Sequence, residues 1–169
     1  MSENRKIKNA SAVFLNGIYF RSTLESKMYS YLIEAGYSPE YEPDKFILWQ
    51  GFRSNTPNYI DGEPTSRKVR GKNEYIPILN PFYDDWEYTP DFKLSINGYT
   101  FYIEVKGYPN DLWPYKKKLF LKLIENDPKT FFFEVKTKKG LLKTLKIIKS
   151  IYEQENPNTE NGGAIVQPS

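Results

Sequence analysis

The sequence predicts a single α/β domain in which helices pack on a mixed β-sheet. Its 169 residues, 39% of them apolar, are enough for one hydrophobic core but few for two. Segments with helical spacing of apolar residues follow segments with strand-like alternation along the chain. The dipeptide Asn-Gly stands between apolar runs at 16–17 and 97–98, where it favours a two-residue hairpin turn. These three observations indicate hairpins and helices built around one sheet.

The elements are expected in a definite order along a domain that covers residues 1–152. A hairpin spans 12–20, and a helix spans 22–35 with Ser22 as N-cap and Gly36 as terminator. The later elements are an extended stretch at 37–49, a short strand at 75–79, a hairpin at 88–107, a helix near 115–125, a strand at 131–136 and a helix at 141–153. The polar start of the chain and residues 153–169 are expected to be disordered.

The absence of two residue types excludes whole classes of chemistry. The chain has no cysteine and no histidine, so disulfides, zinc–thiolate sites and catalytic triads are impossible. Hydrolytic chemistry would have to use Asp, Glu, Lys and Tyr, together with a hard cation bound by oxygen ligands. No run of 18 apolar residues and no apolar N-terminal segment is present, so we expect a cytoplasmic protein with no membrane partner.

The charge distribution favours a nucleic-acid partner. All 24 Lys and Arg residues but only 18 of the 21 acidic residues lie in the first 151 positions, which therefore carry +6. Aromatic residues make up 17% of the chain and are interleaved with lysines. A basic, aromatic surface is typical of proteins that bind DNA or RNA.

The turn at Asn97-Gly98 fixes the register of the second hairpin. A type I′ turn makes Phe92 face Ile103 and makes Asp91 face Glu104. One face is then apolar, with Phe92, Leu94, Phe101, Ile103 and Val105. The other face carries Thr89, Asp91, Lys93, Tyr102, Glu104 and Lys106. Two carboxylates are thus expected with Cβ atoms about 5 Å apart, and Lys106 lies beyond them on the same face.

Two carboxylates placed in this way need a neutralising partner. Like charges on facing strand positions destabilise the pair, and one pKa rises. Mg²⁺ characteristically binds one or two carboxylates together with water and phosphate oxygens. Lys106 could then hold or polarise a water beside the cation. The alternative is a solvated hairpin face whose three charges point into water, but the strongly apolar reverse face favours a cation site.

The motif P-D…E-V-K-G at 90–107 resembles that of the PD-(D/E)xK nuclease superfamily. Three further segments, R-S-T-L-E-S-K at 21–27, G-Y-S-P-E-Y-E at 36–42 and Y-T-P-D-F at 88–92, occur with E-V-K-G in an order similar to that of phage endonuclease I. That family comprises small homodimeric enzymes that cleave four-way (Holliday) DNA junctions. The resemblance implies a restriction-endonuclease-like core and a DNA endonuclease that requires Mg²⁺, with Mn²⁺ able to substitute and no organic cofactor.

The resemblance also implies roles for individual residues. Asp91, Glu104 and the carbonyl of Val105 would be metal ligands, and Lys106 would assist the attacking water, leaving a 5′-phosphate. Glu25 would be the remaining carboxylate and would help to place a second cation about 4 Å from the first.

Glu25 has a structural alternative to this catalytic role. Ser22 and Glu25 form a capping-box pattern, in which the glutamate hydrogen-bonds back to the N-cap amide. Glu25 also stands beside the apolar stripe that contains Met28 and Leu32, where it would face the sheet. Both roles stay open.

Contacts to DNA are expected from basic residues around this site and in the insertion at 50–87. The candidates are Arg21, Lys27, Arg67, Lys68, Arg70, Lys72, Lys116 and Lys117, and the lysines at 143, 146 and 149 could extend the same phosphate track. The alternative for each is an ordinary solvated surface charge.

We expect a homodimer that resolves four-way junctions, in a bacterial host cell if the gene belongs to a phage. Residues 50–87 are longer than the connection expected there in endonuclease I, so they would form an enlarged dimer bridge, a DNA-reading element or both. Three other functions stay open: a sequence-specific endonuclease of restriction or homing type, a non-catalytic DNA-binding module that keeps the fold, and an enzyme directed at RNA.

Overall fold

The computed structural model describes residues 11–56, 66–69, 72–75, 81–108 and 110–154, with side chains left undescribed at 66–69 and 72–75. The chain folds as two units: Met1–Lys45 joined with Thr89–Ser169, and the intervening Phe46–Tyr88. Of the segments expected to be flexible or disordered, 1–11 and 153–169, residues 1–10 and 155–169 lie outside the described residues, whereas Glu153 and Gln154 end the last helix and are not disordered. None of the helices in the described part of the chain is long and apolar enough to cross a membrane.

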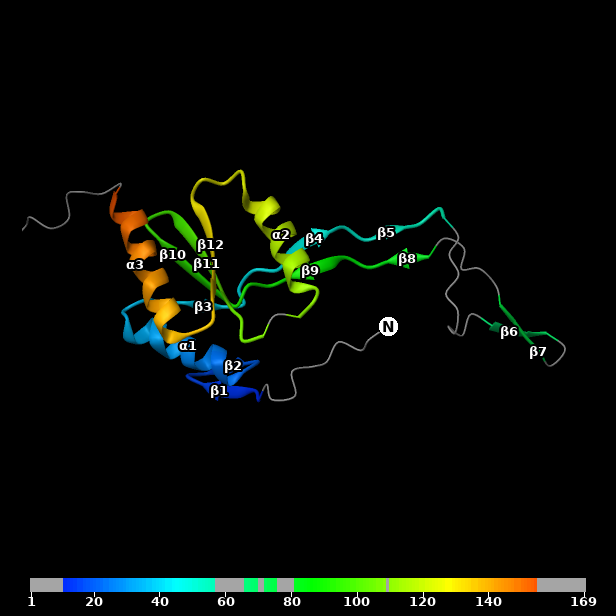
Figure 1. Ribbon diagram of the computed structural model, residues 1–169, viewed down its shortest axis with the longest axis horizontal. Helices are drawn as coiled ribbons and strands as arrows, with labels where there is room; N and C mark the ends of the chain where they lie inside the picture. Colours follow the sequence, from blue (N-terminus) through cyan, green and yellow to red (C-terminus); the bar gives the residue numbers. More distant parts are fainter. Residues whose placement is uncertain (1–10, 57–65, 70–71, 76–80, 109, 155–169) are drawn as a thin grey trace, which may run out of the picture. The chain divides into compact units, whose positions relative to one another are not determined.

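A four-stranded mixed sheet forms the centre of the first unit (Figure 1). Its strand order is β12-β11-β10-β3, with β3 at Glu40–Tyr41, β10 at Phe92–Ile96, β11 at Tyr99–Val105 and β12 at Thr130–Val135. β10 is antiparallel to both of its neighbours, whereas β11 and β12 run parallel. The predicted combination of helices and a mixed sheet is therefore confirmed.

The central hairpin has the register that its turn predicts. Asn97 and Gly98 have φ angles of 50° and 80°, and a type I′ turn requires positive φ at both positions. The β10–β11 ladder runs from Ile96↔Tyr99 to Phe92↔Ile103. It ends one residue short of the predicted pair of Asp91 and Glu104, and the Asp91 side chain instead accepts a hydrogen bond from the amide of Val105.

Two helices cover the apolar face of this sheet. α1, Thr23–Glu34, and α3, Lys138–Gln154, both contribute to one core with β10 and β11. Its buried members include Met28, Leu32, Phe92, Leu94, Phe101, Ile103, Val105, Leu141, Leu145 and Ile148. All five residues predicted for the apolar face belong to it.

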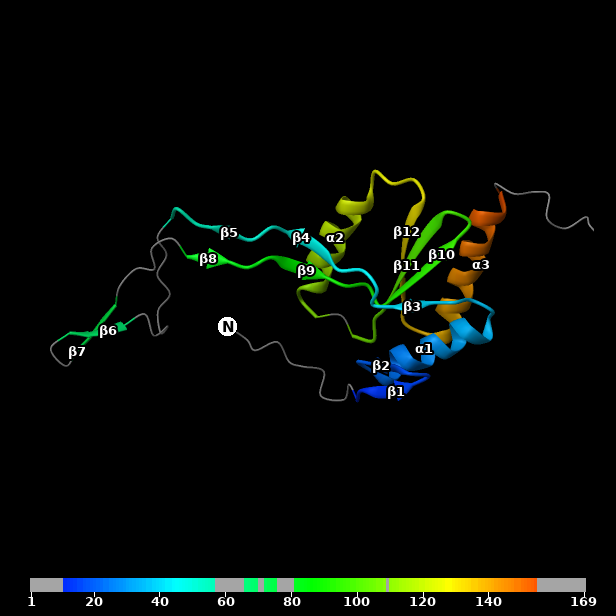
Figure 2. The ribbon, with the colours of Figure 1, turned by 180° about the vertical axis from the view of Figure 1, so that it is seen from behind.

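One helix covers the opposite face. Figures 1 and 2 show the sheet between α3 on one side and α2, Trp113–Ile124, on the other. The buried ring of Phe120 packs edge-on against Tyr102 and Phe132. α2 therefore covers part of the hairpin face that carries the charges, so this face is not fully exposed to solvent.

The remaining elements of the first unit follow the predicted signals closely. β1, Val13–Leu15, and β2, Ile18–Phe20, form the predicted hairpin around Asn16-Gly17. The hydroxyl of Ser22 caps α1, and Gly36 follows it at φ +84°. α3 begins at Lys138, three residues earlier than predicted, because Thr137 accepts a hydrogen bond from the amide of Gly140.

The second unit consists of antiparallel two-stranded ladders. β4, Phe46–Trp49, pairs with β9, Trp86–Tyr88, and β5, Phe52–Arg53, pairs with β8, Phe82–Tyr83. β6, Ser66–Val69, pairs with β7, Lys72–Tyr75. The insertion therefore has strands of its own. Only Tyr75 of the strand expected at 75–79 lies in a strand, and residues 76–80 are outside the described part.

Candidate active site

Asp91 stands where β3, β10 and β11 meet. Its Oδ2 atom accepts a 2.6 Å hydrogen bond from the amide of Val105, and its carbonyl accepts a 2.9 Å bond from the amide of Glu42. The carboxylate is thus tied to β11, one residue from Glu104. Among the described residues, the Val105 amide is the one donor to this carboxylate, which leaves its other oxygen available for a ligand.

Glu104 is the most deeply buried carboxylate of the described chain, with a relative exposure of 2%. It forms an ion pair with the ammonium of Lys106, two residues along the same strand edge. Burial raises the pKa of Asp91 well above its ordinary value, and the Glu104 charge raises it further, while the Val105 amide and Lys106 oppose the shift. The two carboxylates therefore repel each other, although the β10–β11 ladder ends before the facing pair that the turn predicts.

This pair suits a hard divalent cation. Carboxylate oxygens are the ligands that Mg²⁺ prefers, and Mg²⁺ keeps several waters, so two protein carboxylates suffice. Within the described ranges, no group of three acidic side chains is arranged around a common point. With two protein carboxylates, solvent or substrate oxygens would have to complete the coordination of a cation.

Lys106 has a second partner besides Glu104. Its Nζ atom lies 4.3 Å from the centre of the Trp113 ring, and that ring is almost fully buried at the start of α2. An ammonium over an indole face is favourable. The structure thus places Lys106 beside the carboxylate pair and under α2.

The carboxylate of Glu25 is held by three hydrogen bonds. Oε1 accepts from the Ser22 hydroxyl at 2.7 Å, while Oε2 accepts from the Tyr41 hydroxyl at 2.6 Å and from the amide of Arg21 at 3.1 Å. The Ser22 hydroxyl caps the helix by accepting from the Glu25 amide, as predicted, but the Glu25 carboxylate bonds back to the Ser22 hydroxyl and the Arg21 amide in place of the predicted N-cap amide. The charge of Glu25 nevertheless contributes to the raised pKa of Asp91, so this carboxylate lies within electrostatic reach of the pair.

Glu42 is a further carboxylate at the site that the sequence reading missed. Its backbone has a φ of 48°, which is uncommon for a residue other than glycine, and it forms a 2.8 Å ion pair with Arg21. Burial raises the pKa of Glu42, Arg21 opposes the shift, and the charges of Glu25 and Glu104 add to it. The signal in the sequence was the alternation of Glu40 and Glu42 around Tyr41.

A second missed group surrounds Glu134 on β12. The tripeptide E-V-K occurs at 104–106 and again at 134–136, and parallel pairing sets Glu134 directly beside Glu104. Glu134 accepts hydrogen bonds from the Trp113 indole at 3.1 Å and from Lys117 at 3.0 Å, and Lys136 lies 3.9 Å away. Burial tends to raise the pKa of Glu134, but these donors outweigh it and lower the pKa.

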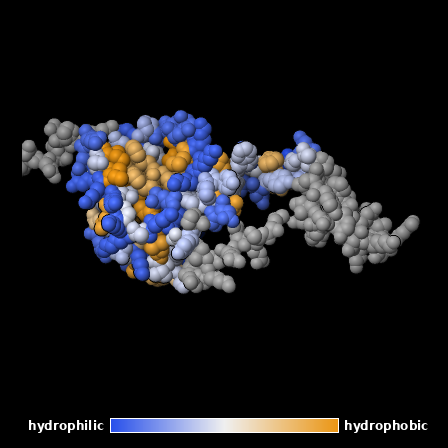
Figure 3. All heavy atoms as spheres, viewed as in Figure 1, coloured by the Kyte–Doolittle hydropathy of each residue, from blue (hydrophilic) through white to orange (hydrophobic). Residues whose placement is uncertain are grey.

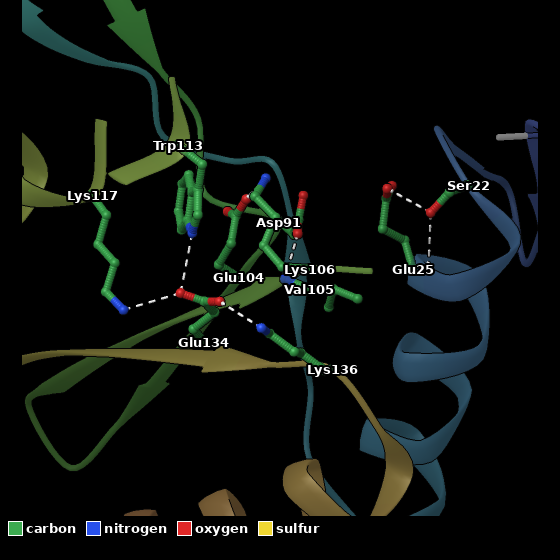
Figure 4. Close-up of polar contacts among 10 residues, drawn as sticks. All are labelled: Ser22, Glu25, Asp91, Glu104, Val105, Lys106, Trp113, Lys117, Glu134 and Lys136. Carbon is green, nitrogen blue, oxygen red and sulfur yellow. Dashed lines mark hydrogen bonds and ion pairs between the residues drawn. The ribbon is translucent and has the colours of Figure 1, made fainter. Parts of the chain in front are cut away.

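Figure 4 shows the carboxylate pair with a group of residues on each side of it. Asp91 and Glu104 lie at the centre, Ser22 and Glu25 stand to one side at the start of α1, and Trp113, Lys117 and Glu134 stand to the other. The site predicted from the hairpin thus gains flanking residues on both sides.

The basic residues predicted to contact DNA differ in their surroundings. Arg21 and Lys117 have carboxylate partners, Glu42 and Glu134, and Lys27 is exposed on α1. Lys116 lies in the first turns of α2, and Lys149 on α3 pairs with Glu153 at 3.4 Å. Arg67, Lys68 and Lys72 are described by backbone alone in β6 and β7, and Arg70 lies outside the described residues.

Comparison of the chain with protein-family models, with curated proteins and with solved structures finds no match.

Proposed function

We propose that the protein is a Mg²⁺-dependent DNA endonuclease with a restriction-endonuclease-like core of the PD-(D/E)xK type. One observation carries the proposal: a hairpin end brings together Asp91, a fully buried Glu104 and the ammonium of Lys106. A buried pair of like charges is costly unless it binds something positive. A bound cation would stabilise the pair of Asp91 and Glu104 by neutralising it.

Asp91, Glu104 and the carbonyl of Val105 would hold the cation. When bound, Mg²⁺ would neutralise the two carboxylates and offset the negative charge that develops on a phosphodiester during its hydrolysis. Lys106 is placed to orient a water with its Nζ atom, and the carboxylates on either side restrict where that water can lie. In the proposed reaction, water attacks phosphorus and the bond to the 3′-oxygen breaks, which leaves a 5′-phosphate.

Glu25 has a secondary role in this proposal. Its three hydrogen bonds fix the start of α1 against β3, and its negative charge adds to the field at Asp91. We therefore propose that Glu25 strengthens cation binding while it caps the helix. The two roles are compatible, because each oxygen of a carboxylate has two lone pairs.

We propose four-way DNA junctions as the substrate and a homodimer as the active form. The similarity of the ordered segments to those of endonuclease I supports both. The second unit supports the dimer separately, because Trp49, Phe52 and Phe82 are 59%, 47% and 57% exposed on its ladders. The face of the first unit in Figure 3 shows apolar side chains mixed with hydrophilic ones. A two-stranded ladder is marginally stable by itself, and a second copy would cover these side chains.

Cleavage of an immobile four-way junction and a matched linear duplex, with Mg²⁺ or EDTA, tests this function. We expect paired nicks in the junction with Mg²⁺ alone, and their loss in Lys106→Ala with the affinity for the junction retained. Lys139→Ala is the matched control, because Lys139 is exposed on α3 and is not among the predicted DNA contacts. Binding without cleavage by the wild type under every condition would leave a DNA-binding module and reject the enzyme.

One observation favours a second candidate, a sequence-specific endonuclease. β6 and β7 form a two-stranded ribbon whose sequence includes R-K-V-R-G-K, and such a ribbon fits the major groove of DNA. Cleavage of linear duplex at one defined sequence in the same assay would favour this candidate. The assignment of Asp91, Glu104 and Lys106 would be unchanged.

A further inference from the structure

The Lys106 ammonium has two partners of different chemistry. One is the carboxylate of Glu104, and the other is the indole ring of Trp113, whose centre lies 4.3 Å from Nζ. A cation that binds Glu104 competes with Lys106 for the same oxygens, since both are positive. The indole face has no lone pair for Mg²⁺, so the cation leaves this second contact intact.

The indole is itself fixed in place. Trp113 is 5% exposed, and its Nε1–H donates to Oε2 of Glu134, the same oxygen that receives Lys117. Lys117 stands on α2 one turn after Trp113, so Glu134 joins β12 to two successive turns of the helix. The in-register pairing of β11 and β12 sets this anchor beside Glu104. The ring is therefore held at both its face and its edge.

We propose that Trp113 is a positioning residue for Lys106, anchored by Glu134 and Lys117, that keeps the ammonium at the carboxylate pair once a cation occupies Glu104. This inference rests on the proposed function, because it assigns Trp113 a part in the same site. Glu134 would serve to hold the ring and not to bind the cation, since its charge is already balanced by Lys117 and Lys136.

Two measurements separate this role from simple packing. The first follows the indole N–H signal of Trp113 by NMR, assigned from its loss in Trp113→Phe, while Mg²⁺ alone is added. We expect the signal to shift with Mg²⁺ in the wild type, and we expect Lys106→Met to abolish most of that shift. A Mg²⁺ response that is identical in Lys106→Met would overturn the proposal.

The second measurement is the single-turnover cleavage rate at saturating protein, with the junction affinity measured separately in EDTA. Trp113→Leu should lower the rate on the order of tenfold, the effect of losing one cation–π contact, and leave the affinity unchanged. Trp113→Phe, which keeps a ring, should recover most of the rate. Phe120→Leu is the control, because Phe120 is the other fully buried residue of α2.

The outcomes distinguish the positioning role of Trp113 from the proposed nuclease activity. Equal rates for wild type and Trp113→Leu would reject the positioning role and leave the nuclease in place. A wild type that cleaves no DNA with Mg²⁺ would reject the nuclease and the positioning role together. If Trp113→Leu does not fold, the NMR comparison of wild type with Lys106→Met still decides the question.

Discussion

The hydroxyl of Tyr41 donates a 2.6 Å hydrogen bond to Oε2 of Glu25 and joins β3 to the first turn of α1. Burial and this hydrogen bond both raise the pKa of Tyr41, so the phenol stays protonated and the contact persists at physiological pH. Glu25 is consequently held by contacts that do not involve the carboxylate pair. Its capping role and its electrostatic role can therefore be separated by substitution.

Ser22→Ala and Glu25→Gln should affect different properties. Ser22→Ala removes the cap and should lower the free energy of unfolding by about 1 kcal/mol, with little change in cleavage. Glu25→Gln keeps an oxygen for the Ser22 hydroxyl but removes the charge, so it should weaken Mg²⁺ binding more than it lowers stability. Urea unfolding and Mg²⁺ titration measure the two effects. If Glu25→Gln matches Ser22→Ala in both assays, Glu25 only caps the helix.

Asp91→Asn should stabilise the protein in EDTA as the pH rises. The folded-state pKa of Asp91 is raised above its unfolded value, so its contribution is most favourable below about pH 4 and is lost as the pH rises through the folded pKa. Asparagine does not titrate and can still accept the Val105 amide. We expect a gain of ~1–3 kcal/mol at neutral to alkaline pH, measured by urea unfolding.

Mg²⁺ should reverse the order of stability, so that the wild type has a higher free energy of unfolding than Asp91→Asn. The cation stabilises the wild type, whose carboxylate pair it neutralises, and has less effect on Asp91→Asn. Lys93→Met, which removes the ion pair between Lys93 of β10 and Asp44, controls for general charge effects. A wild type whose stability in EDTA is flat from pH 4 to pH 9 would contradict the raised pKa.

The backbone of Glu42 predicts an unusual response to branched side chains. Its φ of 48° is left-handed, and β-branched residues are strained there. Glu42→Val should cost about 1–3 kcal/mol, whereas Glu42→Gly, which relieves the strain but loses the Arg21 pair, should cost less. Glu40→Val is the matched control, because Glu40 is exposed on β3 where valine is well accommodated. Equal losses of unfolding free energy in Glu40→Val and Glu42→Val would show that the positive φ at position 42 does not destabilise valine.

Two glycines should respond oppositely to alanine. A Cβ at Gly51 would lie 2.7 Å from the carbonyl oxygen of Tyr83, so Gly51→Ala must separate the strands of the second unit. A Cβ at Gly140 would meet only the Thr137 hydroxyl, at 3.4 Å, and alanine favours helices by up to about 1 kcal/mol.

Hydrogen exchange of the β5 and β8 amides should speed up in Gly51→Ala, and urea unfolding should show Gly140→Ala to be as stable as wild type or more so. If the second unit joins two subunits, Gly51→Ala should also weaken the dimer in sedimentation. Unchanged exchange in Gly51→Ala would mean that the strands can move apart without loss of pairing.

The features that could be predicted from the sequence are those fixed by neighbours in the chain. The Asn97-Gly98 turn and the alternation around it determine the hairpin register, which brings Asp91 and Glu104 near the same end of the hairpin although the ladder stops before them. The capping contact of Ser22 with Glu25 is likewise local.

The remaining site residues depend on contacts between distant segments. The pairing of Glu134 with Glu104 depends on a parallel register, which is set by α2 and by core packing across the intervening chain. The φ angle of Glu42 has no sequence signature comparable to a glycine. The nuclease activity, the DNA substrate and the homodimer stay predictions.

The closeness of Asp91, Glu104 and Lys106 in the chain has a consequence for the order of folding events. A hairpin of this kind closes in about 1–10 μs, whereas parallel pairing across a helical connection is slow. The two like charges are therefore brought together before β12 and α2 arrive, while the hairpin has no other support. A cation that neutralises them should speed the folding limb of a stopped-flow chevron as well as slow unfolding. An effect of Mg²⁺ on unfolding alone would mean that the pair forms only after the sheet is complete.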